Sequence, residues 1–223
     1  MSYFVTGTDT DVGKTLISCA LLHGFAALGK RVVGMKPIAA GLNADGQHDD
    51  VLQLRATSNV PASIEQVNPY RFAPAIAPHL AAQLAGVNID LARIVESYSV
   101  LAKQADVVIV EGAGGFLVPL NAQQDGGDLA KQLGLPIILV VGMRLGCLNH
   151  ALLTVEAIAA RGLVLAGWVA NGMDEDMPAL RENIADLRER IAAPLLGVVP
   201  YMVQPDARVA TRLLDLDCLA SPV

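Results

Sequence analysis

The stretch that most constrains the fold is G-T-D-T-D-V-G-K-T, residues 7–15. It follows the short apolar run Y-F-V-T-G and leads directly into residues 14–28, whose apolar side chains recur at helical spacing. A turn of free backbone amides at the start of a helix attracts anions, because the amides and the helix dipole both point at the bound group. The stretch therefore predicts a strand, a phosphate-binding loop and a helix.

The loop has five residues between its glycines, where the usual pattern G-x-x-x-x-G-K-[ST] has four. The first glycine sets only where the turn starts, so we interpret the loop as a working variant. Lys14 is expected on the β- and γ-phosphates of a nucleotide, and the Thr15 hydroxyl on Mg²⁺. The expected nucleotide contacts in this segment are Asp11, Val12, Gly13, Lys14, Thr15 and Leu16.

Short unbroken apolar runs alternate with longer segments of helical period. Such runs indicate strands buried on both faces, which is typical of a parallel sheet covered by helices. The expected strands are residues 3–7, 31–37, 106–112, 136–142, 165–171 and 195–200, and the expected helices are 14–28, 89–104, 148–161 and 178–191. We predict one α/β domain over residues 1–223, doubly wound around a mainly parallel sheet with the architecture of P-loop NTPases.

Composition excludes several partners. The net charge of −6 and the pI near 5.1 argue against a surface that neutralises nucleic-acid phosphates. The chain opens without a basic stretch before an apolar run, and its longest apolar segments fall short of the roughly 20 residues of a membrane helix. We expect a cytoplasmic protein that binds neither nucleic acid nor membrane. The three scattered cysteines are expected to be buried or inert.

Acidic and basic candidates lie at predicted strand ends. Glu111 ends the strand D-V-V-I-V-E-G, where ligands gather in open α/β sheets, and is expected to bind Mg²⁺ directly or through water. Residues 41–78 form a long polar excursion, helical near 49–57, in which Asp49 or Asp50 is either a further carboxylate of the site or a helix N-cap. Lys36 ends another strand, and spacing alone leaves open whether it is solvated or catalytic.

Several motifs occur in a fixed order along the chain. The loop is followed by G-M-K-P-I-A-A-G, V-N-P-Y-R-F, V-E-G-A-G-G, G-C-L-N-H-A and A-G-W-V-A-N. From residue 3 to about residue 206 the ordered set resembles the dethiobiotin synthetase family. The resemblance implies a reaction in which 7,8-diaminononanoate, CO₂ and MgATP give dethiobiotin, ADP and phosphate through a carbamate and a carbamic-phosphoric anhydride.

The resemblance also implies residue roles. Lys36 and Lys14 would be catalytic, and Thr15, Asp50 and Glu111 would hold Mg²⁺. Substrate would contact Thr10, Ala40 and the helix start at Gly146, Cys147, Leu148 and Asn149, near the interface of a homodimer. The remaining implied nucleotide contacts are Glu111, Gly112, Ala113 and Gly114 at the phosphates, and Asn171, Gly172, Pro200, Tyr201 and Met202 on the adenine side.

The chain departs from the family pattern at a few positions. Ala40 stands where Ser or Thr is common, so that contact is absent or made by backbone. Asp11 stands where Glu is common, and Gly172 where Asp is common. The segment from Gln204 matches poorly, which leaves open whether Asp206 contacts the ribose or the base.

Two other classes have a similar ATP-binding domain. The cobyrinate-type amidating synthetases add a glutamine-using domain, for which we expect no room in this chain. Partition and division-site ATPases carry a signature lysine five positions before the loop lysine, where this chain has Asp9. The sequence also lacks a terminal basic amphipathic helix of the kind that binds membranes.

Overall fold

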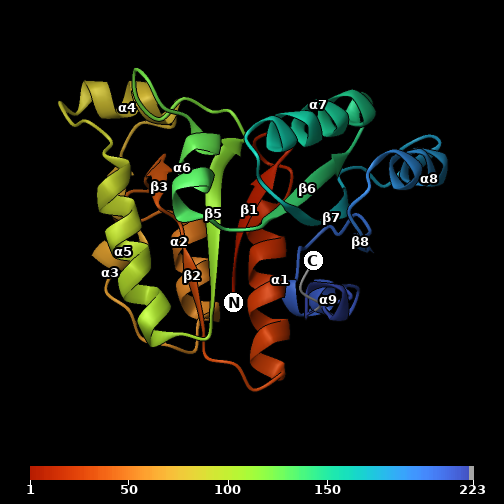
Figure 1. Ribbon diagram of the computed structural model, residues 1–223, viewed down its shortest axis with the longest axis horizontal. Coiled ribbons are helices and arrows are strands. Elements are labelled where there is room, and N and C mark those ends of the chain that lie inside the picture. Colours follow the sequence, from red (N-terminus) through yellow and green to blue (C-terminus); the bar gives the residue numbers. More distant parts are fainter. Residues whose placement is uncertain (221–223) are drawn as a thin grey trace.

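The computed structural model describes residues 1–220 and has a six-stranded parallel sheet at its centre (Figure 1). The strand order is β2-β5-β1-β6-β7-β8, and every neighbouring pair is parallel. The strands are β1 (Ser2–Gly7), β2 (Val32–Met35), β5 (Val107–Gly115), β6 (Ile137–Met143), β7 (Leu165–Gly172) and β8 (Leu195–Val199). The predicted fold class is confirmed.

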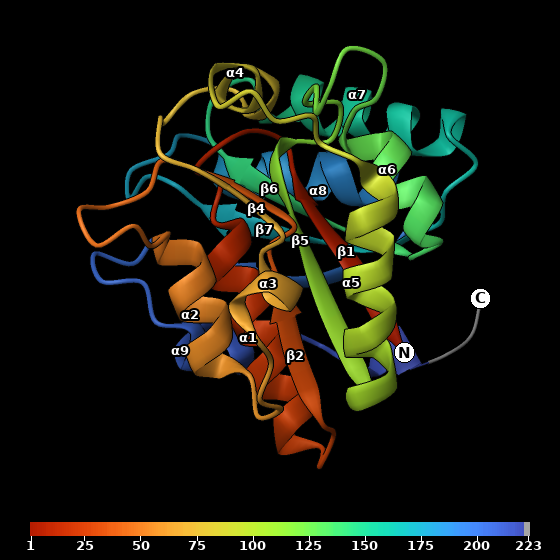
Figure 2. The ribbon, with the colours of Figure 1, turned by 90° about the vertical axis from the view of Figure 1, so that its left-hand side faces the viewer.

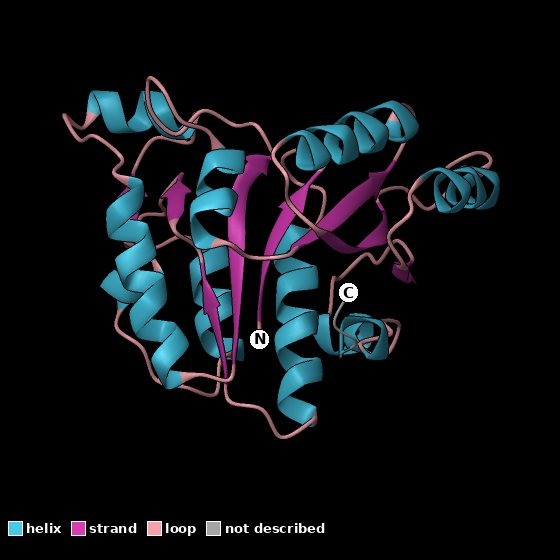
Figure 3. Ribbon diagram, in the orientation of Figure 1, coloured by secondary structure: helices cyan, strands magenta, loops and turns pink. Residues whose placement is uncertain are grey.

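Helices cover both faces of the sheet, as Figures 2 and 3 show. One face packs on α1 (Lys14–Ala27), α2 (Asp49–Thr57) and α9 (Ala207–Thr211), and α10 (Asp217–Ala220) lies on the same side. The other face packs on α5 (Leu91–Gln104), α6 (Gly126–Leu133), α7 (Cys147–Ala160) and α8 (Leu180–Arg190). Side chains of each strand alternate between the two cores: Val140 faces α1, and its neighbours Leu139 and Val141 face α7.

The excursion after β2 has more structure than the sequence indicated. A second small sheet pairs β3 (Ile38–Ala40) with β4 (Tyr70–Phe72) in parallel. The predicted helix at residues 49–57 is confirmed as α2, and the short helices α3 (Ile64–Val67) and α4 (Pro78–Leu84) follow. The small sheet fixes the chain that leaves β2, so the segment that begins at Lys36 is held on two sides.

Because the six central strands are parallel, they all end at one edge of the sheet, and the arrow of β5 points to this edge at the top of Figure 3. The loops that follow them therefore converge there, as in other open α/β sheets. No helix among residues 1–220 is both long and apolar enough to cross a membrane. The single domain over residues 1–223 stays a prediction, and its last residues, 221–223, lie outside the described part. Cys19 and Cys147 are buried as expected, whereas Cys218 is exposed.

The core around α1 gives a stability prediction. Leu21 is fully buried between α1 and the sheet, so Leu21→Ala should lower the free energy of unfolding by about 2 to 5 kcal/mol through lost contacts and the cavity left behind. Leu28, the C-cap of the same helix, is 61% exposed, and Leu28→Ala should cost no more than about 0.5 kcal/mol. Urea unfolding of both variants measures the difference, and equal losses would contradict the placement of α1.

Candidate active site

The phosphate loop joins β1 to α1 at the edge where the strands end. Gly13 has φ 91° and Asp11 has φ 57°, so the turn uses left-handed backbone at two positions. A side chain at Gly13 would come within 2.2 Å of the amide nitrogen of Asn171, which makes glycine necessary there. Lys14 opens the helix, and its Nζ donates to the carbonyl oxygen of Asp9 at 2.8 Å. The loop thus wraps around its own lysine.

Lys14 is only 6% exposed, and this changes its proton affinity. Burial disfavours the ammonium, and the nearby positive charge of Lys36 adds to the effect. The carboxylates of Glu111, Asp50 and Asp11 oppose both causes without cancelling them, so the pKa of Lys14 falls from 10.5 to about 8. An anion bound in the loop would therefore favour the charged form of Lys14.

Lys36 lies between two carboxylates. Its Nζ is 2.6 Å from Oε1 of Glu111 and 2.7 Å from Oδ2 of Asp50, and both Lys36 and Glu111 are buried. Burial alone would lower the pKa of Lys36, but the two carboxylates outweigh it and raise the pKa above its ordinary value. Burial would raise the pKa of Asp50, and the Lys36 ammonium overrides it and lowers that pKa. Lys36 is therefore charged and held in place.

The backbone of Lys36 is anchored by the motif V-N-P-Y-R-F. Its N–H donates to the carbonyl oxygen of Val67 at 2.9 Å. Nδ2 of Asn68 donates to the carbonyl oxygens of Lys36 and Tyr70, at 2.6 and 3.0 Å. The sequence singled out this motif without assigning Asn68 a role; the structure shows that Asn68 ties the end of β2 to β4.

Thr15 and Glu111 present oxygen atoms to the loop. The Thr15 hydroxyl donates to Oε1 of Glu111 at 2.9 Å. Oε2 of Glu111 is fully buried and has no hydrogen-bond partner among the described residues. Because a buried carboxylate oxygen without a partner is costly, Oε2 is suited to a cation that is not part of the chain.

The residues present fit a magnesium ion. Thr15, Asp50 and Glu111 offer hydroxyl and carboxylate oxygens, which Mg²⁺ prefers. Within residues 1–220 no group of three or more His, Cys, Asp or Glu side chains is placed to hold a metal. That agrees with the usual mode of Mg²⁺, which takes one or two protein carboxylates and completes its shell with phosphates and water.

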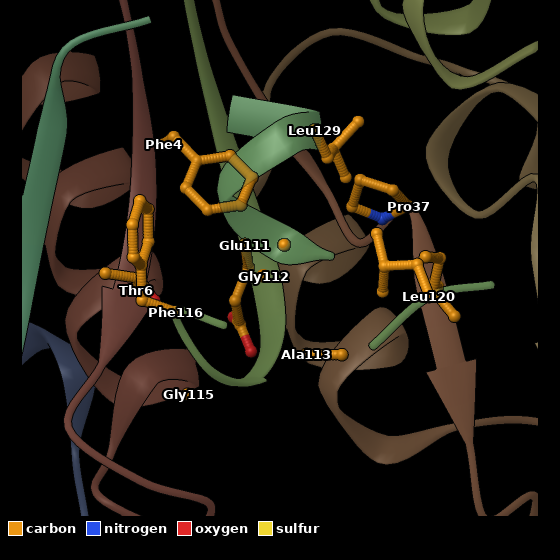
Figure 4. Close-up of a pocket in the computed structure, with 12 residues that line it drawn as sticks. Phe4, Thr6, Pro37, Glu111, Gly112, Ala113, Gly115, Phe116, Leu120 and Leu129 are labelled. Atoms are coloured by element: carbon orange, nitrogen blue, oxygen red, sulfur yellow. The ribbon is translucent and has the colours of Figure 1, made fainter. Parts of the chain in front are cut away.

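An apolar pocket lies behind Glu111 (Figure 4). Phe4, Pro37 and Leu129 line it together with the Glu111–Ala113 backbone, and its volume of about 10 Å³ leaves room for about one water molecule. This wall keeps bulk water away from one side of the carboxylate. Charges beside Glu111 therefore interact more strongly than they would in water.

The predicted adenine-side residues adjoin the loop. Nδ2 of Asn171 donates to the carbonyl oxygen of Val12 at 2.9 Å, so this amide supports the loop. A side chain at Gly172 would meet the backbone nitrogen of Tyr201 at 2.6 Å. The structure thus brings Asn171 and Gly172 next to residues 200–201. Because β7 and β2 lie on opposite sides of β1 in the sheet, these residues are on the far side of the loop from Lys36.

Two of the predicted substrate residues lie near the phosphate loop and the small sheet. Thr10 is exposed on the loop beside Gly114, where a Cβ atom would lie 3.4 Å from the Thr10 hydroxyl oxygen. Ala40 is the last residue of β3, and its carbonyl oxygen lies 3.2 Å from Nε2 of His48. The structure therefore shows a backbone contact at Ala40 with the protein itself.

The other predicted substrate residues form the start of α7. Gly146 has φ 93°, Cys147 is buried, and Leu148 and Asn149 follow in the first turn. Arg144, which no sequence pattern singled out, forms an ion pair with Asp9. This pair ties the start of α7 to the phosphate loop.

The fold and this loop define the class: the protein is a P-loop nucleotide-binding protein of the α/β type. A MinD cell division protein from Aquifex aeolicus shares the fold, with a TM-score of 0.55 and 15% identity over 91% of this chain and 83% of that one. A ParA family ATPase from Chlorobium tepidum gives a TM-score of 0.56 at 13% identity, covering 94% and 89% of the two chains. Likeness at this identity shows the fold alone.

Sequence comparison gives the family. A family model described as an AAA domain matches residues 1–208. A protein from Nitrosospira multiformis named ATP-dependent dethiobiotin synthetase is 56% identical over 96% of this chain and 94% of its own length. Proteins of the same name from Aromatoleum aromaticum and Janthinobacterium are 54% and 49% identical, over 95% and 97% of this chain and 96% and 94% of theirs. The chain belongs to the ATP-dependent dethiobiotin synthetase family, as its ordered motifs predicted.

Lys14 predicts a pH dependence. Below pH 8 the folded state holds a charged, buried Lys14, whereas between pH 8 and 10.5 it has lost a proton that the unfolded chain retains. The unfolded state then binds more protons, so stability rises with pH in this window. The free energy of unfolding of the wild type, relative to Lys14→Met, should increase by about 3 kcal/mol between pH 7 and 10.5.

Urea unfolding of both proteins across this pH range, in buffers without phosphate or nucleotide, measures the difference. Subtracting the variant removes the contributions of the other titrating groups. A difference that stays flat with pH would show that Lys14 keeps an ordinary pKa.

Proposed function

We propose that the protein is an ATP-dependent dethiobiotin synthetase, which converts 7,8-diaminononanoate, CO₂ and MgATP to dethiobiotin, ADP and phosphate. The observation that carries the proposal is the position of the Lys36 ammonium, within 2.7 Å of both Asp50 and Glu111 and beside a phosphate loop. A carbamate that meets the γ-phosphate of a nucleotide in this loop would be near that buried positive charge. Relatives of that name, similar in length and about half-identical in sequence, support the same activity.

The phosphate end of the site neutralises charge. The amides of Asp11, Val12 and Gly13 and the start of α1 would bind the β- and γ-phosphates, with Leu16 and the Gly112–Gly114 end of β5 beside them. Lys14 would leave the Asp9 carbonyl and contact the transferring phosphoryl group. Thr15, Asp50 and Glu111 would hold the Mg²⁺, whose positive charge would offset the negative charge of the phosphates.

Lys36 would act on the reacting oxygen. One amine of the substrate takes up CO₂ to give a carbamate, and a carbamate oxygen attacks the γ-phosphate with loss of ADP. The second amine then attacks the carbonyl carbon of the mixed anhydride and expels phosphate as the ring closes. A charged Lys36 stabilises the carbamate and the transferring phosphoryl group, and such fixed charges in a water-poor site supply the largest share of rate enhancement in this kind of chemistry.

The substrate carboxylate would bind at the start of α7. The free amides of Gly146, Cys147, Leu148 and Asn149 and the helix dipole suit an anion. Thr10 would contact the other end of the substrate. We propose a homodimer with this site near its interface, because Leu145 and Leu153 on this segment are 100% and 56% exposed, as apolar side chains of a subunit interface would be in one isolated chain.

Asn171, Gly172 and Pro200, Tyr201 and Met202 would contact adenine. In support, they lie together beside the loop, on the side away from Lys36. The Asn171 side chain has its nitrogen engaged with Val12, which leaves its oxygen to accept from the exocyclic amine of adenine. The cytoplasmic location stays a prediction.

The regulatory ATPases of the partition type remain the alternative. They share the fold, but the position of their signature lysine is Asp9 here, and Asp9 is paired with Arg144 of the same chain. The signature lysine of those ATPases reaches across a dimer to the nucleotide of the partner. Asp9 has the opposite charge and is paired within its own chain, so it is not suited to that role. The site therefore favours the synthetase.

Product formation tests the proposed function. Purified protein with MgATP, bicarbonate and 7,8-diaminononanoate should form dethiobiotin, detected by mass spectrometry, with one phosphate released per ring closed. Omitting the diamine or bicarbonate should abolish phosphate release. Vigorous ATP hydrolysis that ignores both would instead indicate a regulatory ATPase.

Lys36 gives the sharpest variant. Lys36→Gln should lower kcat by about 10²- to 10³-fold, because a charge that acts on the transferring group is lost. ATP affinity, measured by calorimetry, should change little, whereas Lys14→Ala should abolish turnover. Lys30→Gln, at an exposed site beyond α1, is the matched control and should behave as wild type. Near-normal turnover of a folded Lys36→Gln protein would remove Lys36 from the mechanism.

A further inference from the structure

We propose that His48 is a positioning residue. It would hold the carboxylate of Asp50, which is a proposed Mg²⁺ ligand, at a fixed distance from β3, whose last residue Ala40 is a proposed substrate contact. The inference rests on the proposed function for the role of Asp50, and it adds a residue that the motifs did not single out. His48 makes no hydrogen bond to Lys36 or Glu111 within the described part of the chain. It would act through Asp50.

Both ring nitrogens of His48 are engaged. Nδ1 accepts a hydrogen bond from the backbone N–H of Asp50 at 3.2 Å, so Nδ1 carries no hydrogen. The ring hydrogen is then on Nε2, which lies 3.2 Å from the carbonyl oxygen of Ala40 and donates to it. The ring therefore links the last residue of β3 to the first turn of α2.

The His48 ring connects β3 directly to the start of α2, and the two are otherwise joined through the intervening loop. Along the chain, residues 41–47 separate β3 from His48, and Asn43 folds them into a closed turn. The Asn43 side chain accepts from the N–H groups of Asp45 and Gln47, each at 3.0 Å. Within residues 1–220, no hydrogen bond made by residues 43–47 reaches β3, so the His48 ring is the direct connection.

Asp50 depends on the orientation of the first turn of α2. Its Oδ2 lies 2.7 Å from Nζ of Lys36, a distance that leaves little room for movement. Val51 and Leu54 are buried in the cores and keep α2 docked. Loss of His48 should therefore leave the helix in place while letting its start, at Asp49 and Asp50, shift, and a displacement of about 1 Å can cost about 10²-fold in rate.

Ala40 gives the link a second role. The methyl side chain of Ala40 has no polar atom, so this residue can form hydrogen bonds only through its backbone N–H and C=O groups. The carbonyl of Ala40 is occupied by His48 and is fixed by the ring. His48 thus sets the position of the end of β3 as well as that of Asp50.

An ordinary N-cap is the alternative, since His48 is the N-cap residue of α2. Two substitutions separate the roles. Asn can cap the helix through Oδ1 in place of Nδ1 but is too short to reach Ala40, so His48→Asn keeps the cap and loses the link. Gln can place a donor near Nε2, so His48→Gln retains the link and loses the cap; His48→Ala loses both.

The experiment measures metal binding as well as turnover. Mn²⁺ serves as the paramagnetic probe for the Mg²⁺ site, titrated by electron paramagnetic resonance into the full-length protein with ADP and without the diamine. We expect His48→Asn to bind Mn²⁺ about fivefold to tenfold more weakly than wild type, and kcat to fall about tenfold or more, with an unchanged unfolding midpoint. His48→Gln should recover most of the Mn²⁺ affinity that His48→Ala loses.

Two results would overturn the proposal. Wild-type Mn²⁺ affinity and kcat in His48→Asn would show that His48 is only a cap. A loss in His48→Gln as large as in His48→Ala would show that the link to Ala40 contributes nothing. Failure of the proposed function is separate, since it appears as absence of dethiobiotin from the wild type, while the Mn²⁺ arm contains no diamine.

Discussion

The ion pair between Lys36 and the buried carboxylate of Glu111 is the interaction on which the rest of the site depends. A buried charge is tolerated only when it is paired, and removal of one partner of such a pair typically costs about 3 to 5 kcal/mol. This pair joins β2 to β5, and Asp50 brings α2 to the same point. The central sheet, the excursion and the phosphate loop therefore meet at one ammonium group, and the chemistry we propose uses the charge that holds them together.

Local patterns in the sequence predicted most of the framework. The apolar runs indicated the six strands, and the loop indicated its helix. Glu111 was expected at the end of its strand, but β5 continues to Gly115, so Glu111 lies inside the strand and its side chain reaches Thr15 from there. Short or polar elements were missed. Strands β3 and β4 have three residues each, too few for a periodic pattern, and α6 begins with Gly126 and Gly127, which are poor helix formers. Its capping box, from Asp125 to Asp128, is the signal that would have located it.

The missed contacts of the site join residues far apart in the sequence. Arg144 and Asp9 are separated by 135 positions, and Asn68 and Lys36 by 32. No local pattern pairs such residues, because the fold decides which loops meet at the sheet edge. The ambiguity at Asp50 is of another kind. The sequence left open whether it was a cap or a ligand, and the structure gives the cap to His48 and turns the Asp50 side chain to Lys36.

The contact between Asn171 and the phosphate loop has a consequence for nucleotide choice. Its amide nitrogen supports Val12, and the absence of a side chain at Gly13 makes room for it. A substitution of Asn171 made to accept another base would therefore also remove a hydrogen bond that supports the phosphate loop. If residues 200–202 contact adenine as we propose, they are the place to alter the base preference, because Tyr201 is 44% exposed and supports no part of the loop by a side-chain hydrogen bond in the described structure. With the adenine contacts that we propose, base preference and phosphate binding would be coupled at Asn171, at the end of β7, and separable at residues 200–202, after the end of β8.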